Sequence, residues 1–156
     1  MGAIYEVIIV GSGPAGLTAG LYTSRAGLST LILEKETMGG ELMNRDLIEN
    51  YPGYPDGILG SQLGSNMVTQ IMNCGVEIIL DTVEKIDIRE DYRVVETSQG
   101  NYWGSAMIIA PGSRSKKLDV PGEHSLLTKE YSIVRPAMGL DLVTKPLRLL
   151  GQATPE

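Results

Sequence analysis

Three glycines and one carboxylate carry the clearest chemical signal in this sequence of 156 residues. Gly11, Gly13 and Gly16 follow an uninterrupted apolar run, Val7 to Val10, which is typical of a strand buried on both faces of a parallel sheet. This spacing suits a tight turn, a close approach of backbone to a pyrophosphate, and close packing of the next helix against the strand. Such a helix would direct its free N–H groups at the phosphates.

Glu34 stands about 20 residues beyond the glycine turn, at the end of a second apolar run. A carboxylate there can accept hydrogen bonds from an adenosine ribose and would repel a 2′-phosphate, so the pattern favours FAD or NAD over NADP. A glycine-rich turn without any ligand is the alternative, because such turns are common. The order of strand, turn, helix and acid favours dinucleotide binding.

Composition limits the class of protein. The chain is 42% hydrophobic and 21% charged, as soluble globular domains are, and its net charge of −6 argues against a nucleic-acid partner. No apolar run reaches the roughly 18 residues of a membrane helix, so we expect a cytoplasmic protein that does not enter a membrane. The single cysteine, Cys74, excludes an internal disulfide or dithiol, and we expect no metal site.

The rest of the pattern predicts the elements that position these groups. We expect helices over Pro14 to Ala26 and from Ser61 to just before Gly75, separated by a loop over 44–57 that is rich in proline and glycine. Strands are expected at 76–80, placed centrally in the sheet, at 83–88, 92–97 and 101–103 as an antiparallel meander, and at 106–110 as a buried parallel strand. The sequence therefore predicts an α/β fold with a Rossmann-like parallel sheet, helices, and a small antiparallel β-meander.

Two further residues could be reactive. Cys74 is expected to be a small buried hydrophobe in the last turn of the second helix, and the alternative is a reactive thiol. His124, the only histidine, is expected in an exposed loop, and the alternative is a catalytic base. No acid–base partner is evident for either residue, so no catalytic residue is assigned.

Over residues 4–123 the chain resembles the FAD-binding half of low-molecular-weight thioredoxin-reductase-like flavoproteins. Residues 11–16 match the first glycine motif of that family, residues 39–42 resemble its Gly-Gly-Gln-Leu, and residues 48–53 match its Glu-Asn-aromatic-Pro-Gly segment. Residues 108–112 resemble its Ile-Ile-Ala-Thr-Gly strand end. The resemblance implies FAD contacts from Gly11, Ser12, Gly13, Pro14, Ala15, Gly16, Glu34, Lys35, Gly39, Gly40, Glu41, Leu42, Asn50, Ala110 and Gly112.

The resemblance also implies a domain arrangement. Residues 1–123 would form the FAD-binding α/β domain, and residues 124–138 would be a short connection in place of an NADPH domain. Residues 139–156 would be the segment that returns to the FAD domain, where Asp141 would contact the cofactor. An unrelated tail is the alternative for Asp141 to Arg148.

Several positions depart from the family pattern. Glu41 replaces Gln and becomes only an acceptor when ionised, Pro111 replaces Thr and removes a backbone donor, and Leu140 replaces a Gly. Neither a second glycine motif nor a CxxC is present, so we do not expect complete NADPH-to-disulfide turnover by this chain alone.

These features lead to three hypotheses. The first is an FAD-binding oxidoreductase module that receives hydride from free or partner-borne NAD(P)H, or works with a redox-protein partner. The second is a non-catalytic flavin or nucleotide-binding subunit, and the third is a truncated product that folds without retaining FAD. A homodimer is expected by analogy with the family.

Overall fold

The structure is a computed structural model that describes residues 4–113. The expectations for residues 114–123, the connection 124–138 and the return segment 139–156 lie outside the described residues. The same is true of the expectations for His124, Leu140 and Asp141.

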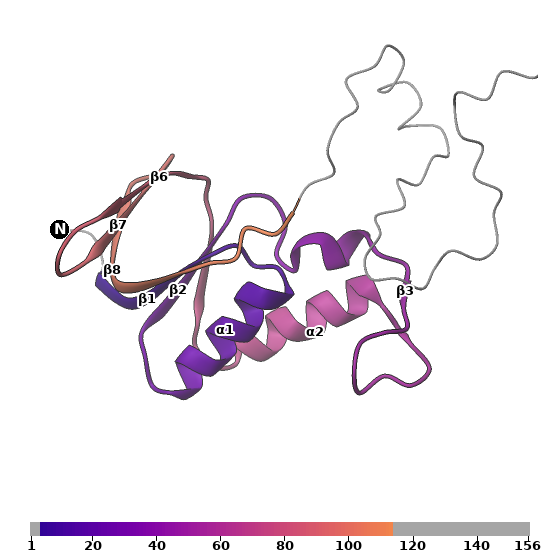
Figure 1. Cartoon of the computed structure of the whole chain (residues 1–156). Helices are drawn as coiled ribbons and strands as arrows, with labels where there is room; N and C mark the ends of the chain where they lie inside the picture. The colour runs from indigo at the N-terminus through magenta and orange to yellow at the C-terminus, as the bar shows by residue number, and fades with distance from the viewer. Residues whose placement is uncertain (1–3, 114–156) are drawn as a thin grey trace, which may run out of the picture. The chain divides into compact units, whose positions relative to one another are not determined.

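Six strands form one sheet in the order β5-β2-β1-β8-β7-β6 (Figure 1). Strands β5, β2, β1 and β8 pair in parallel, whereas β6, β7 and the first part of β8 pair antiparallel. The predicted α/β class, a parallel sheet with an antiparallel meander, is confirmed. The bounds are β1 (Ile4–Val10), β2 (Thr30–Glu34), β5 (Glu77–Leu80), β6 (Val83–Ile88), β7 (Arg93–Thr97) and β8 (Asn101–Ile109).

Strand β8 belongs to both parts of the sheet, so the prediction of two separate strands over 101–103 and 106–110 was wrong. Gly104 pairs with Arg93 of β7 on one side and with Tyr5 of β1 on the other. A Cβ atom at Gly104 would lie 2.8 Å from Cγ1 of Ile8, so a larger residue there would force the Ile8 side chain to move. The polar break at 104–105 marks the place where pairing with β7 ends and pairing with β1 continues, rather than the end of a strand.

Strand β5 lies at the edge of the sheet, and its predicted central position was wrong. Within residues 4–113 it pairs only with β2, and Leu80 is 49% exposed. The last part of β8 is also less buried than predicted, because it pairs only with β1 among the described strands and leaves Ile109 63% exposed. Apolar composition alone does not distinguish an edge strand from a central one.

Helices α1 (Pro14–Arg25) and α2 (Gly60–Met72) cover one face of the parallel strands, close to the predicted bounds (Figure 1). Gly20 of α1 allows close packing, because a Cβ there would lie 2.9 Å from Cδ1 of Ile32. The buried cluster on this face consists of Val7, Ile9, Leu17, Ile32, Ile71 and Val76.

The opposite face is covered by the meander. Val95 of β7 packs against Ile8, Leu31 and Leu33, all of them fully buried or nearly so. Alternate side chains of β1 therefore enter two different cores. This explains why β1 has no polar position between Val7 and Val10.

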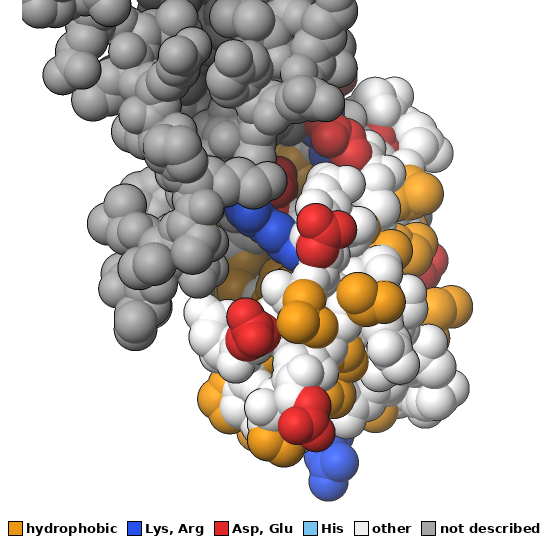
Figure 2. All heavy atoms as spheres, turned by 90° about the vertical axis from the view of Figure 1, so that its right-hand side faces the viewer, with side chains coloured by type: hydrophobic (Ala, Val, Ile, Leu, Met, Phe, Trp, Pro, Cys, Tyr) orange, Lys and Arg blue, Asp and Glu red, His pale blue; other side chains and the backbone are white. Residues whose placement is uncertain are grey.

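The remaining short elements lie between β2 and α2. The 3-10 helix η1 (Gly40–Asn44) precedes a two-stranded antiparallel pair of β3 (Leu47–Ile48) and β4 (Ile58–Leu59). The predicted loop over 44–57 therefore contains one short strand. Leu47 and Leu59 are about half exposed, and Figure 2 shows hydrophobic side chains among acidic ones on this face.

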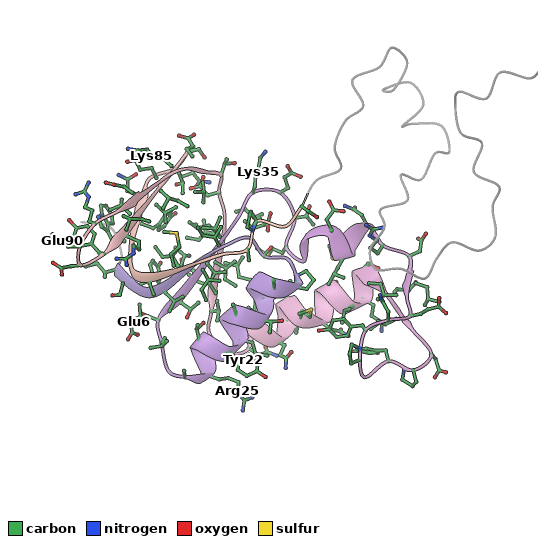
Figure 3. The ribbon with its side chains drawn as sticks, in the orientation of Figure 1. Glu6, Tyr22, Arg25, Lys35, Lys85 and Glu90 are labelled. Carbon is green, nitrogen blue, oxygen red and sulfur yellow. The ribbon has the colours of Figure 1, made fainter. Side chains whose placement is uncertain are left out.

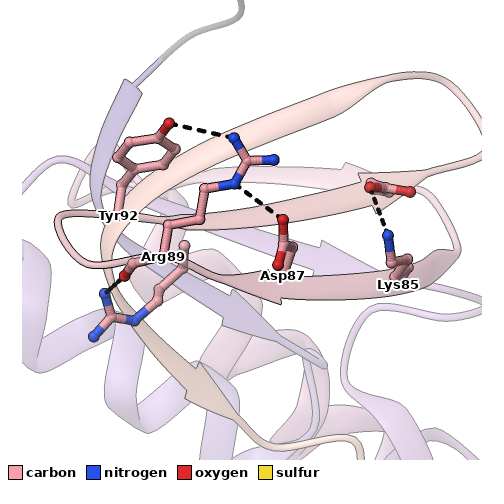
Figure 4. Close-up of polar contacts among 6 residues, drawn as sticks. Lys85, Asp87, Arg89 and Tyr92 are labelled. Atoms are coloured by element: carbon pink, nitrogen blue, oxygen red, sulfur yellow. Dashed lines mark hydrogen bonds and ion pairs between the residues drawn. The ribbon is translucent and has the colours of Figure 1, made fainter.

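Charged side chains lie mainly on the outside. Figure 3 shows Glu6, Arg25, Lys35, Lys85 and Glu90 pointing away from the sheet and helices. On the meander, Arg89 pairs with Asp87 at 3.0 Å and Lys85 with Glu96 at 3.4 Å (Figure 4). These pairs are solvent-exposed and add little to the free energy of unfolding.

Cys74 is exposed, so its predicted burial was wrong. Helix α2 ends at Met72, and its buried face ends at Ile71. Cys74 follows in the turn before β5, outside the helical periodicity. Within residues 4–113, neither helix has the length and apolarity that spanning a membrane requires.

Replacing Gly16 by Ala should lower the free energy of unfolding by about 2 kcal/mol or more, measured by urea denaturation. The new methyl group would overlap the carbonyl oxygen of Gly11, which outweighs the helix propensity of about 1 kcal/mol gained by Ala. Gly13→Ala is the matched control, because a Cβ at Gly13 would meet no atom of residues 4–113 within 4 Å. Equal stability of the two variants would contradict this packing.

Candidate functional site

The glycine loop lies at the carboxyl ends of β1, β2 and β8. The N–H of Gly11 donates to Leu33 O at 2.8 Å, and Ala110 N donates to Val10 O at 2.8 Å. Gly11 has φ of +102°, and a Cβ there would overlap the carbonyl oxygen of Ala110. The loop therefore fits between two neighbouring strands only because position 11 is glycine.

Gly16 and Gly13 have different roles. Gly16 packs against the carbonyl of Gly11 and lies 3.4 Å from Cγ2 of Ile9, measured from an ideal Cβ. Gly13 has an ordinary φ of −69° and open space where a Cβ would lie. Because neither packing nor backbone conformation within the described residues requires glycine at position 13, the open space fits a ligand that approaches the backbone.

The N-terminus of α1 faces this open space without a capping side chain. Gly13 is the N-cap, Pro14 occupies the first turn, and the first turn contains no acidic residue. The first backbone N–H groups of a helix have no partner inside the helix, and the helix dipole makes this end positive. The arrangement suits a phosphate group.

The second glycine pair packs against the first glycine motif. The N–H of Gly39 donates to Ser12 O at 3.0 Å, and a Cβ on Gly40 would lie 3.0 Å from Cα of Gly13. Both Gly39 and Gly40 have positive φ. The loop after β2 thus forms a second wall beside Gly13, and η1 begins there with Glu41 and Leu42.

Helix η1 is held in place from its other side by α2. The sulfur atom of Met43 lies close to Gly39 and to Gly64 of α2. A Cβ atom added to Gly39 would be 3.0 Å from it, and one added to Gly64 would be 2.8 Å from it. Leu42 Cβ is 3.5 Å from the same position at Gly64. These close contacts fix the Gly39–Gly40 segment relative to the helix layer.

The Glu34 carboxylate joins the end of β2 to the glycine loop. Its Oε2 accepts hydrogen bonds from the backbone N–H and the hydroxyl of Ser12, both at 2.7 Å. Its Oε1 accepts from the backbone N–H groups of Lys35 at 2.8 Å and Glu36 at 3.0 Å. Burial alone would raise the pKa of Glu34, but these four donors outweigh it and lower the pKa below its ordinary value of 4.5.

The contacts described above bring together Gly11, Ser12, Gly13, Gly16, Glu34, Gly39, Gly40 and Ala110. Lys35 is exposed next to this group and pairs with Glu36 at 3.5 Å. Asn50 is exposed in the loop between β3 and β4, and Gly112 is exposed beyond β8. No described contact connects Asn50 or Gly112 with the glycine loop, and Asp141 lies outside the described residues.

Sequence reasoning missed one buried acid next to this site. Asp81 directly follows β5 and is only 4% exposed. Its signal in the sequence is its position immediately after an apolar strand, because ligands of α/β proteins bind at the carboxyl ends of parallel strands.

The pH dependence of folding should report the hydrogen bonds of Glu34. A carboxylate with a lowered pKa in the folded state stabilises the protein above its unfolded pKa, and this stability is lost as the pH falls through the folded pKa. We expect Glu34→Gln to destabilise the chain at pH 7 and to converge towards the unchanged chain below about pH 4.5 in urea denaturation. Glu84→Gln, at an exposed position, is the control. A constant difference at all pH values would refute this role.

Comparison with known proteins identifies the family. The family model for pyridine nucleotide-disulphide oxidoreductases matches residues 5–151. The chain is 43% identical over 148 residues to thioredoxin reductase of Bacillus subtilis, covering 95% of this chain and 46% of that protein. It is 39% identical over 122 residues to the 34.2 kDa protein in the rubredoxin operon of Clostridium pasteurianum, covering 78% of this chain and 39% of that protein.

Solved structures show the same relationship. The crystal structure of Lactococcus lactis thioredoxin reductase matches with a TM-score of 0.75 and 40% identity, covering 80% of this chain and 41% of that one. Thioredoxin reductase of Streptococcus pyogenes matches with a TM-score of 0.73 and 43% identity, covering 80% of this chain and 40% of that one. The chain spans about half the length of its relatives or less. It belongs to the pyridine nucleotide-disulphide oxidoreductase family and corresponds to a partial module of the thioredoxin-reductase type.

Proposed function

We propose that this chain is an FAD-binding oxidoreductase module of the thioredoxin-reductase type. The observation that carries the proposal is the open space at Gly13, which is bounded by the N-terminus of α1 and by Gly40 and lies close to the carboxylate of Glu34. A pyrophosphate and an adenosine ribose need these three features together.

The adenosine diphosphate half would be held by the described residues. The backbone at Gly13 and the first turn of α1 would donate to the pyrophosphate, while Glu34 would accept from the ribose hydroxyls. In the structure, Glu34 already accepts four hydrogen bonds, so a ribose hydroxyl would have to share Oε2 with the Ser12 hydroxyl or displace it. Ser12 therefore orients the carboxylate before the ligand binds.

Two observations support binding of the flavin half. The Gly39–Gly40 segment packs directly against the glycine loop, and the sequence resembles the family in this region. The hydrogen bond from Gly39 to Ser12 joins the glycine loop to the start of η1, which contains Glu41 and Leu42. We propose that Gly40, Glu41, Asn50, Ala110 and Gly112 lie along the riboflavin half, with Asp141 contributing from outside the described residues. When bound, FAD would supply the hydride and electron transfer, and the protein would orient it.

The electron donor and acceptor would lie outside this chain. Its sequence contains one thiol, so we propose that hydride comes from free or partner-borne NAD(P)H and that a disulfide substrate is reduced through a partner protein. We also propose the division into residues 1–123, 124–138 and 139–156. A cytoplasmic homodimer is the expected form, with exposed Leu47 and Leu59 as surface that association could cover.

A non-catalytic flavin or nucleotide-binding subunit, or a truncated product, is the second candidate. It is favoured by the coverage of the relatives, since the chain matches 46% of the Bacillus subtilis protein. FAD binding distinguishes a truncated product from the other candidates, and reduction of the bound cofactor distinguishes the oxidoreductase module from a non-catalytic subunit.

The full chain should bind added FAD and remain yellow after unbound FAD is removed, and NADH or NADPH should bleach the visible flavin absorbance under anaerobic conditions. Bleaching requires hydride transfer to bound flavin, so it tests the oxidoreductase proposal directly. A yellow protein that neither nucleotide reduces would favour the second candidate. Failure to bind FAD would contradict the proposal.

Gly13→Val should reduce FAD affinity at least about 100-fold, because the side chain would fill the space that the pyrophosphate needs. Ala26→Val at the other end of α1 is the matched control, and it should bind FAD like the unchanged chain. Flavin fluorescence titration measures both affinities, and urea denaturation checks that both variants fold. Unchanged affinity in folded Gly13→Val would refute the assignment of this space to the pyrophosphate.

A further inference from the structure

A buried acid anchors the meander next to the proposed adenosine site. Asp81 Oδ1 accepts a hydrogen bond of 2.6 Å from the hydroxyl of Ser98, in the turn between β7 and β8. Two more bonds join this turn to the end of β5, from Ser98 N to Thr82 O at 3.3 Å and from Gln99 Nε2 to Leu80 O at 3.1 Å. The turn is therefore fixed to β5 by three hydrogen bonds.

The same residue is bonded to Glu34. Strands β2 and β5 pair so that Glu34 lies opposite Leu80, and the N–H of Asp81 donates to Glu34 O at 2.7 Å. This bond is the last connection between the two strands before β2 ends. On the other side of β2, the N–H of Gly11 donates to Leu33 O. The backbone that carries the Glu34 carboxylate is thus held from both neighbours.

Asp81 is a buried acid, although a neutral side chain could also accept the hydrogen bond that anchors the turn. Its side chain is 4% exposed, and Oδ2 has no hydrogen-bond partner within residues 4–113. The ion pairs found in this part of the chain do not include it. Burial alone would raise the pKa of this carboxyl, but the Ser98 hydroxyl and neighbouring donors outweigh this effect and lower the pKa below its ordinary value of 3.8.

A buried carboxylate costs free energy, and a neutral acceptor would avoid that cost. An ionised acceptor forms a shorter and stronger hydrogen bond, which restricts the geometry more tightly. The bond between Asp81 and Ser98 would therefore restrict the position of the backbone at the end of β5, where Asp81 N donates to Glu34 O. Rigidity matters at Glu34 because its carboxylate must meet a ribose hydroxyl within hydrogen-bonding distance.

We propose that Asp81 is a positioning residue for recognition of the adenosine ribose, acting through its clamp on the β7–β8 turn and the backbone of Glu34. This inference rests on the proposed function and extends it to a residue that does not touch the ligand. The clamp holds the end of β5 in place, β5 holds the end of β2, and Glu34 presents its carboxylate from there.

The test compares ADP with 2′-deoxy-ADP, which lacks the 2′-hydroxyl of the ribose, by isothermal titration calorimetry on the full chain. The unchanged chain should bind ADP about tenfold more tightly than 2′-deoxy-ADP. In Asp81→Ala and Ser98→Ala this ratio should fall to about threefold or less, because Glu34 is less well placed. Asp87→Asn, which removes an acid of the same meander, should leave the ratio unchanged.

The ratio of the two affinities distinguishes a positioning role from a loss of folded protein, because partial unfolding weakens the binding of both ligands equally. An unchanged ratio in the folded variants would overturn the inference and leave the proposed function intact. If Asp81→Ala does not fold, the ratio in Ser98→Ala decides the matter, since this change removes only one hydroxyl from an exposed turn. No ADP binding by the unchanged chain would overturn both the proposed function and this inference.

Discussion

The four hydrogen bonds received by Glu34 are the interaction on which the candidate site depends. They join the end of β2 to the glycine loop through Ser12 and to the next loop through Lys35 and Glu36. The second of these loops leads to Gly39, which bonds back to Ser12. The glycine loop and the segment from Glu34 to Gly40, which are distant in sequence, are therefore held together around Gly13.

The glycines satisfy steric constraints of different origin. Gly11 and Gly16 are required by protein contacts, since side chains there would overlap the carbonyls of Ala110 and Gly11. Gly13 is not required by any such contact in the described residues. A position that the described residues leave open beside a helix N-terminus is the physical basis for assigning a ligand to this site.

Much of this arrangement could be predicted because it depends on local sequence. The β-branched run, the glycine spacing and the acid at the end of the second strand identify β1, α1 and β2. Strand position could not be predicted, because β5 at the edge is as apolar as a central strand. The continuous β8 was missed because its pairing with β7 ends at Gly104 while its pairing with β1 continues. Asp81 was missed because its partners lie in a distant turn.

We propose that the space at Gly13 binds the diphosphate of a dinucleotide. Amide chemical shifts of the full chain, recorded by NMR during titration with ADP, would locate the binding site residue by residue. We expect the largest shifts at Ser12, Gly13, Ala15, Gly16 and Gly40. Large shifts confined to α2 or to the β6–β7 hairpin, or no shifts at saturating ADP, would contradict it.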